Sequence, residues 1–310
     1  MIKTITDKAE YSLNPKLETQ IESYNTPLVL NGQTWLIQDD YWMKHVHIKV
    51  TNACNAKCPF CIENGCHEQT DWGRLTSNLD QLLKEMSEQG HLTTVSITGG
   101  EPTLFPDEIS NIISIIKKYN AHFVTINTNG TNLFPAMKDV NWINISRHTI
   151  GDDETCHIKA LDIEALKKFR EEYPNLKVRI QCVLYDQGVK NIEDFIKFVD
   201  YYSAIADDIS IRRLITTGAH ETDPNDLFTQ IKEFLYNSPE AEFKEQVLKD
   251  YYVYETWHFH GTDITFSHSD MKLLYHMEAI EPDNILREIV VHPDGTISGS
   301  WSKTKKLIKG

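Results

Sequence analysis

Cysteine is scarce in this sequence, and its distribution is uneven. The 310 residues include six cysteines, and three of them fall within TNACNAKCPFC (51–61). Half of the six cysteines share one short segment, which does not resemble a disulfide framework. We therefore expect that segment to bind a metal or to take part in catalysis. We therefore expect reduced thiols and a cytoplasmic protein.

Long apolar runs and an excess of positive charge are also lacking. No stretch approaches the roughly twenty apolar residues that a bilayer span needs, and the start, MIKTITDKAEYSLN, lacks the apolar core of a signal peptide. The formal net charge is −14, whereas a large nucleic-acid footprint needs clustered lysine and arginine. We expect neither a membrane nor a nucleic-acid partner, and the charge favours neutral or cationic substrates.

What the sequence does have is an alternation of apolar runs and amphipathic stretches, which is typical of β/α folds. Strands are predicted at 46–50, 94–98, 123–127, 142–146, 178–184 and 209–215. Helices are predicted at 77–89, 106–118, 132–138, 162–172 and 191–204. Six strands with five crossovers predict a parallel sheet with right-handed connections.

The predicted strands alternate between apolar and polar residues, although strands covered on both faces are usually continuously apolar. The apolar set should face the helices: Val46, Ile48, Val50, Val95, Ile97, Ile143, Ile145, Val178, Ile180, Cys182, Ile209 and Ile211. The opposite set is polar: Lys49, Ser96, Thr98, Thr125, Asn127, Asn144, Ser146, His148, Arg179, Gln181, Ser210 and Arg212. Since a closed eight-stranded barrel fills its interior with branched apolar side chains, the pattern predicts a partial, open, six-stranded β/α barrel with a ligand in its lumen. An ordinary open sheet with one solvated face is the alternative.

Three regions follow from this pattern. Residues 1–43 form an N-terminal extension whose Asn31-Gly32 pair predicts a hairpin, and we expect this hairpin to close part of the barrel. Residues 44–216 hold the partial barrel. Residues 217–310 form a β-rich C-terminal region, which we expect to cap the barrel or contact substrate.

Cys54, Cys58 and Cys61 directly follow the first predicted strand, at the edge where β/α folds place their active sites. Three thiolates can hold three irons of a [4Fe–4S] cluster and leave the fourth iron open to an outside ligand. The alternative is a structural zinc ion, for which Cys66 or His67 could complete a tetrahedral set. Structural zinc more often uses two separated pairs of ligands, and no second pair is visible.

Three short motifs resemble those of one enzyme family. CNAKCPFC (54–61) resembles the CxxxCxΦC signature of radical S-adenosylmethionine (SAM) enzymes, with Phe60 as the aromatic residue. GGEPT (99–103) resembles the GGE motif of that family, and NTNG (127–130) resembles its TNG turn. The motifs end three successive predicted strands in the expected order, and the resemblance covers residues 44–216.

The resemblance implies an activity and its cofactors. A [4Fe–4S] cluster on Cys54, Cys58 and Cys61 would bind SAM and cleave it reductively to a 5′-deoxyadenosyl radical, with electrons from a donor such as flavodoxin or ferredoxin. The radical would abstract hydrogen from a small-molecule, nucleoside, sugar or peptide substrate. A zinc- or cluster-stabilised binding protein without radical chemistry is the alternative. No cysteine follows Cys182, and Ser298 and Ser300 stand where relatives with an auxiliary-cluster domain often have one, so a second cluster lacks ligands.

The same resemblance implies a set of SAM-binding residues. Gly99 and Gly100 let the backbone approach a ligand, and Glu101 or nearby main-chain carbonyls can accept from its amino group. Arg147, His148, Arg179 and Arg212 are candidates for the SAM carboxylate or a substrate anion. GGEP and Asn129-Gly130 also occur as ordinary turns. The expected cofactor-binding set is Phe60, Gly99, Gly100, Glu101, Pro102, Asn127, Asn129, Ser146, Arg179 and Arg212.

Two further groups of residues have candidate roles. Cys156, in GDDETCHIK beyond the fourth strand, is a candidate hydrogen-atom donor because Asp152, Asp153 and Glu154 should keep its thiol protonated; the alternative is an exposed cysteine without a role. Cys182 should be an inert packed thiol. His258 and His260 have the spacing of a metal pair, but their aromatic surroundings favour packing.

Overall fold

The computed structural model describes most of the chain. The described residues are 24–38, 45–61, 63, 68–91, 94–216, 220–222, 226–249, 251–269, 271–301, 303 and 306–308. Cys66 and His67, the two additional zinc ligands considered above, lie outside this set.

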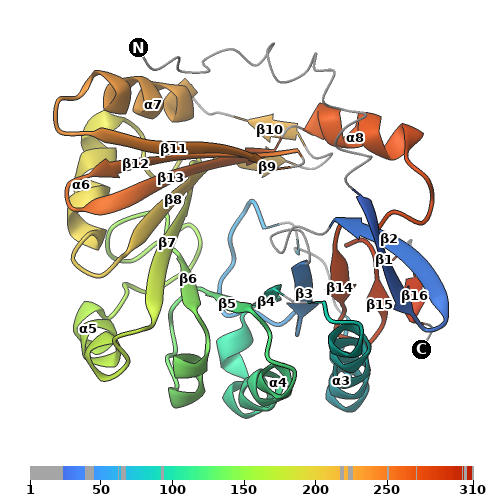
Figure 1. Ribbon diagram of the computed structural model, residues 1–310. Helices are drawn as coiled ribbons and strands as arrows, with labels where there is room; N and C mark the ends of the chain where they lie inside the picture. Colours follow the sequence, from blue (N-terminus) through green and yellow to red (C-terminus); the bar gives the residue numbers. More distant parts are fainter. Residues whose placement is uncertain are drawn as a thin grey trace.

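One mixed sheet dominates the structure. Its centre contains β3 (His45–Lys49), β4 (Thr94–Thr98), β5 (Phe123–Thr128), β6 (Trp142–Ser146), β7 (Lys177–Val183) and β8 (Asp208–Arg212). All neighbouring pairs in this row are parallel, and their order in the sheet is their order in the sequence. Figure 1 shows that the row curves into an open arc. The predicted six-stranded partial barrel is therefore confirmed.

Helices follow the strands and lie on the outer side of the arc, as α3, α4 and α5 show in Figure 1. The crossovers contain α3 (Trp72–Glu88), α4 (Pro106–Lys118), α5 (Ile163–Glu172) and α6 (Ile192–Tyr202), together with the 3₁₀ turns η2 (Pro102–Leu104) and η3 (Pro135–Asp139). Side chains that accept a hydrogen bond from the first helical turn begin three of the helices, namely Asp71, Asp162 and Asn191. The helix predicted at 132–138 is the short turn η3 instead, because Pro135 fits only the start of a helix and a few residues follow before β6.

The two faces of the sheet differ as the sequence predicts. Every member of the apolar set, from Val46 to Ile211, is fully buried and belongs to the main hydrophobic core beneath the helices. The inner, concave face is polar, and we call the space that it lines the lumen. Cross-strand register places Asn127 beside Asn144 and Asn144 beside Arg179, so these polar side chains form one row across the lumen. The alternation therefore reflects a polar interior, in which Ser96, Asn144 and Ser210 are nevertheless buried.

The N-terminal hairpin does not join this sheet. β1 (Tyr24–Leu30) and β2 (Gln33–Gln38) form a separate two-stranded sheet around Asn31 and Gly32, both of which have positive φ. Gln89, at the end of α3, hydrogen-bonds the backbone of Val29 in both directions, with distances of 2.7 Å. The hairpin thus packs on the outer layer, and the expectation that it closes the barrel is wrong.

Strands from the C-terminal region extend the arc at both ends instead. At one end, β13 (Thr262–Ser269) lies parallel to β8 and continues into β12 (Tyr252–Phe259) and β11 (Glu242–Lys249). At the other, β14 (Ile289–Val291) lies parallel to β3 and continues into β15 (Ile297–Ser298) and β16 (Lys306–Ile308). α7 (Leu227–Asn237) and α8 (Met271–Ile280) complete this region, and β9 (Leu214–Thr216) pairs separately with β10 (His220–Thr222). The single sheet therefore crosses the expected boundary at residue 216.

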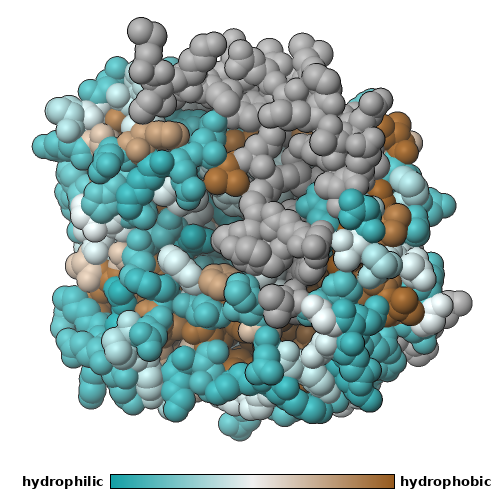
Figure 2. All heavy atoms as spheres, viewed as in Figure 1, coloured by the Kyte–Doolittle hydropathy of each residue, from teal (hydrophilic) through white to brown (hydrophobic). Residues whose placement is uncertain are grey.

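The outer surface matches this layering. In the space-filling view, hydrophilic side chains predominate over the visible part of the helical layer, and hydrophobic ones show as smaller patches between them (Figure 2). Among the helices described above, none has both the length and the apolar character that crossing a bilayer requires.

Glu288, directly before β14, gives the stability a pH dependence. Burial raises the pKa of its carboxyl to about 7 from an ordinary 4.5, although the Trp301 indole N–H donates to it over 3.1 Å. Between these two pH values the folded chain binds more protons than the unfolded chain, so stability falls as pH rises through this range. We expect Glu288→Gln to be more stable than wild type at pH 8 by about 1–2 kcal/mol, and this advantage to shrink towards pH 5.

Urea unfolding of both proteins at pH 5 and pH 8 measures the effect of Glu288. Glu88→Gln, which removes an exposed carboxylate from α3, controls for the loss of one negative charge. Equal stability of wild type and Glu288→Gln at pH 8 would show that the carboxyl ionises without cost.

Candidate active site

The cysteine loop follows β3 at the C-terminal edge of the barrel. Cys54 and Cys61 are exposed and Cys58 is half-buried, so all three sulfurs can be reached. Burial raises the pKa of Cys54, and the nearby thiols of Cys58 and Cys61 add to this shift in smaller measure. Three accessible sulfurs on one short loop, close enough to repel one another as thiolates, fit the three-thiolate demand of a [4Fe–4S] cluster with one open iron.

Gly99 and Gly100 hold the end of β4 directly against the cysteine loop. A β-carbon on Gly99 would lie 2.6 Å from the Thr51 carbonyl oxygen, and one on Gly100 would lie 2.1 Å from that of Ala53. The Gly100 N–H donates to the Thr51 carbonyl over 2.6 Å, and the Glu101 N–H donates to that of Ala53 over 2.7 Å. Two glycines are therefore required by the loop's own backbone, and their contact with a ligand stays a prediction.

Glu101 joins the second motif to the third. Its carboxylate is 1% exposed and accepts from the Thr103 N–H at 2.9 Å and from the Thr128 hydroxyl at 2.7 Å. The Asn129 N–H donates to its other oxygen over 2.6 Å. Pro102 is also buried and begins η2. These bonds use much of the hydrogen-bonding capacity of the Glu101 carboxylate. Of the two acceptors expected for the SAM amino group, the nearby main-chain carbonyls are therefore better placed than Glu101.

The NTNG turn completes the connection between the three motifs. Asn129 donates through Nδ2 to Oδ1 of Asn55, a residue between the first two cysteines, over 2.6 Å. Gly130 has φ of +75°, and a β-carbon there would lie 2.7 Å from Ile145. Asn127 instead points into the lumen, where it donates to the Ser96 hydroxyl over 2.9 Å. Asn55, Thr103 and Thr128 are connecting residues that the motif comparison did not single out.

Phe60 anchors the far end of the cysteine loop. Its ring contacts His148 and Tyr185 with centroid separations of 5.1 Å and 4.9 Å. Tyr185 donates to the buried Asp153 at 3.1 Å, and Asp153 accepts the Cys156 N–H at 2.9 Å. The aromatic position of the signature therefore packs the loop onto residues 148–158 and onto Tyr185, just after β7.

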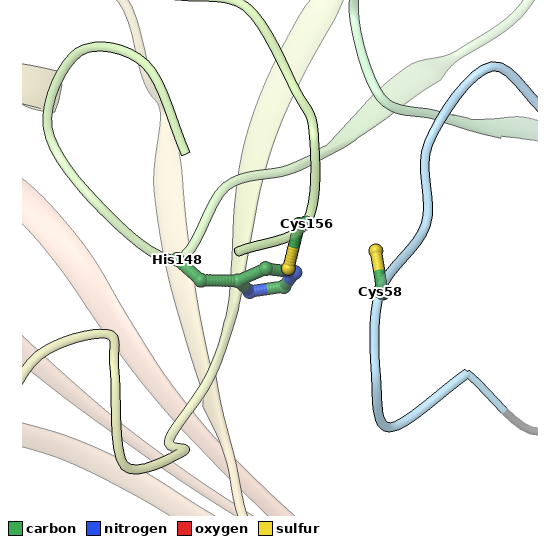
Figure 3. Close-up of side chains that lie close together, drawn as sticks. All are labelled: Cys58, His148 and Cys156. Atoms are coloured by element: carbon green, nitrogen blue, oxygen red, sulfur yellow. The ribbon is translucent and has the colours of Figure 1, made fainter. Parts of the chain in front are cut away.

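Cys156 and His148 meet Cys58 at this contact. Their sulfur and nitrogen atoms all lie within 4.8 Å of one another, and Figure 3 shows Cys58 on one loop facing the other two side chains. Cys156 is fully buried, contrary to the exposed alternative considered above. Hydrogen bonds from Cys156 and His148 lower the pKa of Cys58 to about 5. The sequence placed both cysteines at the same edge of the sheet but did not reveal this contact.

The pKa of Cys156 is raised, but the three acidic neighbours named above are not the main cause. The pKa of its thiol is raised chiefly by the hydrogen bond with Cys58 and by burial, and Asp153 contributes less. Cys182 is fully buried in the apolar core, as predicted, and burial raises its pKa as well. Whether Cys156 gives a hydrogen atom to substrate stays a prediction.

The candidate arginines occupy different environments. Arg147 is buried outside the lumen and donates to the Lys159 carbonyl. Arg179 lies two residues before Gln181 in β7 and forms an ion pair with Asp208. Its guanidinium carbon lies 4.8 Å from the centre of the Trp142 ring. Arg212 ends β8, and part of its surface is exposed. Loss of solvent around its guanidinium lowers its pKa, and the nearby Tyr254 opposes this shift. Arg212 is the candidate most open to an anion.

The C-terminal candidates for metal binding are engaged otherwise. His258 contacts Asp263 at 2.9 Å, whereas His260 lies in the following turn and contacts Glu240 at 3.1 Å. Over the residues that the structure describes, Cys58, His148 and Cys156 are the one group of three or more such side chains with ligand geometry. Ser298 contacts His292 at 2.7 Å and donates to the Ser300 carbonyl at 2.6 Å.

The solved structures with a similar fold include SuiB of Streptococcus suis bound to S-adenosylmethionine. It aligns over 100% of this chain and 69% of its own, with a TM-score of 0.58 and 16% sequence identity. A second, anSMEcpe with bound AdoMet and a peptide, aligns over 85% of this chain and 77% of its own with a TM-score of 0.51 and 14% identity. At these identities the likeness concerns the fold.

Curated relatives are more similar in sequence. A probable GTP 3′,8-cyclase of Sulfolobus acidocaldarius is 29% identical over 57% of this chain and 58% of its own length. A GTP 3′,8-cyclase of Shewanella denitrificans is 24% identical over 76% of this chain and 70% of its own. The chain thus spans little more than half of the Sulfolobus relative.

The region around the cysteine loop also matches a family description. Residues 48–199, from β3 to α6, match the sequence model of the Radical SAM superfamily. This region contains the end of β3, the cysteine loop, both glycine-bearing turns and the four central strands β4 to β7. The match, the three motifs and the partial barrel together identify residues 48–199 as a radical SAM region, and the enzymes of that superfamily use a [4Fe–4S] cluster and S-adenosylmethionine as cofactors.

Proposed function

We propose that this protein is a radical SAM enzyme that cleaves SAM reductively and abstracts hydrogen from a substrate held in the lumen. The observation that carries the proposal is the bonding of three motif loops into one unit. Gly99 and Gly100 fix the cysteine loop from one side, and Asn129 fixes it from another. Cys54, Cys58 and Cys61 would hold the cluster there, and the bound cluster and SAM would supply a 5′-deoxyadenosyl radical.

The neighbouring polar groups fit the parts of SAM. Main-chain carbonyls at Gly99 and Gly100 would accept from its amino group, and Ser146, half-buried at the end of β6, would contact its ribose. The buried Oδ1 of Asn144 has no hydrogen-bond partner in the described part of the chain, so a donor on a bound ligand could satisfy it. These assignments are supported by position at the C-terminal ends of parallel strands.

Arg212 supports an anionic substrate. The alternation along β8 assigns the exposed Arg212 to the lumen-facing set. Tyr252 and Tyr254, which influence its pKa, belong to the C-terminal region proposed to contact substrate. A fixed cation inside the barrel attracts anions locally, even in a chain whose net charge of −14 favoured neutral or cationic substrates. GTP is the first candidate, because the curated relatives are named GTP 3′,8-cyclases.

Anaerobic reconstitution with iron and sulfide tests the activity. We expect a brown protein with about four irons per chain that converts SAM to 5′-deoxyadenosine when dithionite, or reduced flavodoxin or ferredoxin, supplies electrons. A colourless protein that retains zinc and leaves SAM intact would identify the binding-protein alternative. About eight irons per chain would reveal a second cluster site that we have not recognised.

Adding GTP to the same reaction tests the substrate. If GTP is the substrate, 5′-deoxyadenosine formation should increase and GTP should be consumed in equal amount. Unchanged GTP beside continued SAM cleavage would remove GTP from consideration and leave the radical SAM assignment standing.

A further inference from the structure

We propose that Cys156 and His148 donate hydrogen bonds to the sulfur of Cys58 when that residue holds the cluster, and that they thereby raise the reduction potential of the cluster. The proposal rests on the proposed function, because it requires Cys58 to be an iron ligand. It assigns the two residues a positioning role towards the cluster and does not require either of them to contact substrate.

The protonation state of His148 follows from its surroundings. The backbone N–H of Val183 points at Nδ1 of His148 with a separation of 3.1 Å. An N–H donor can be accepted only by a nitrogen without a proton, so the proton of the neutral imidazole must be on Nε2. The imidazole therefore has its N–H on the side of the ring turned towards Cys58, whose sulfur lies within 4.8 Å of a ring nitrogen (Figure 3).

The thiol of Cys156 has two available acceptors. One is the Tyr185 hydroxyl oxygen, at 3.8 Å, and the other is the sulfur of Cys58, which lies within 4.8 Å of the Cys156 sulfur. Tyr185 already donates its own proton to Asp153. A metal-bound thiolate carries negative charge and accepts more strongly than a neutral phenol oxygen, so the Cys156 proton should go to Cys58.

The backbone keeps these donors in place. The Lys57 N–H, next to Cys58, donates to the Cys156 carbonyl over 2.7 Å and ties the two loops together. Asp153 fixes the other side of Cys156 through its backbone N–H at 2.9 Å. Cys156 and His148 are both at least 96% buried, so bulk water cannot replace them as donors.

Hydrogen bonds to cluster sulfurs affect the redox couple because the reduced cluster carries one more negative charge. Donors aimed at a ligand sulfur stabilise that charge and move the potential upwards. An asymmetric arrangement, with two buried donors at Cys58, therefore favours reduction at a cluster that must accept an electron before SAM is cleaved.

The test is an anaerobic redox titration of the reconstituted protein, followed by the electron paramagnetic resonance signal of the reduced cluster. Cys156→Ala and His148→Leu each remove one donor and should shift the midpoint potential to more negative values, with the iron content unchanged. Cys156→Ser and His148→Gln keep a donor and should recover most of the wild-type potential. Cys182→Ala, which removes a buried thiol from the opposite face of the sheet, should leave the potential unchanged.

Unaltered potentials in both donor-free variants, at full iron content, would overturn the proposal. An equal loss of iron in Cys156→Ala and Cys156→Ser would also overturn it, because Cys156 would then be acting as a ligand. A wild-type protein that binds no cluster would instead refute the proposed function, so the two failures are distinguishable.

Discussion

Replacing Cys54, Cys58 and Cys61 together by alanine is expected to abolish both the brown colour and SAM cleavage. The three sulfurs are the accessible thiols at the C-terminal end of β3, and a [4Fe–4S] cluster has no other set of three ligands on one loop of the described chain. Iron content should fall from about four per chain to background, and 5′-deoxyadenosine should become undetectable. Iron analysis and chromatography of the reaction products measure these two losses.

Two single replacements control for the loss of thiols in general. Cys182→Ala removes a fully buried thiol from the apolar face, and Cys66→Ala removes the next cysteine after the loop. Both should keep the cluster. Circular dichroism should show that the triple variant is folded, and SAM cleavage by a folded triple variant would refute the cluster assignment.

Gly100→Ala is expected to reduce cluster loading severalfold although it changes no ligand. The new β-carbon would lie 2.1 Å from the oxygen and 2.6 Å from the carbon of the Ala53 carbonyl, and backbone cannot rotate away as a flexible side chain can. Relief requires the loop carrying Cys54 to move, and such overpacking typically costs about 1–3 kcal/mol. We expect a lower iron content after reconstitution and a lower urea midpoint of the metal-free chain.

Gly73→Ala is the matched control for Gly100→Ala. Gly73 lies in the first turn of α3, where a β-carbon would meet only Asp71, at an ordinary 3.6 Å. Since alanine favours helix over glycine, this variant should be as stable as wild type or slightly more stable, with full cluster loading. Equal iron content in both variants would show that the close approach at Gly100 does not position the cysteine loop.

Much of the barrel could be predicted because the alternation of apolar and polar residues can be recognised within a single strand. Val46, Ile48 and Val50 identify the buried face of β3 within five residues, and the same reading holds for the other five strands. The N-terminal hairpin shows the limit of this approach. Asn31-Gly32 fixed the turn, but which surface the hairpin covers depends on α3 and its Gln89, far along the chain.

The sequence predicts three candidate ligands, but it does not predict the contacts around them. Spacing identifies Cys54, Cys58 and Cys61, because one loop supplies all three. The approach of Cys156 to Cys58 depends on how residues 151–158 cross the barrel mouth, and a single backbone hydrogen bond from Lys57 fixes that path. Glu101 is an acidic residue in a ligand-binding motif, so the sequence suggests that it binds a ligand. Its carboxylate instead accepts from Thr128 and Asn129, which belong to the next strand and its turn.

The way in which β13 and β14 extend the arc has a consequence for folding during synthesis. Ile289 pairs with Val46 and Thr265 with Ser210, so both outer edges of the early-made strands are covered by segments translated much later. Contacts so distant in sequence form slowly, and an uncovered strand edge can pair with another chain. A ribosome-bound intermediate of this protein would therefore expose the β3 edge until residues 289–291 have been made, which makes premature release or chaperone depletion the condition under which aggregation is expected.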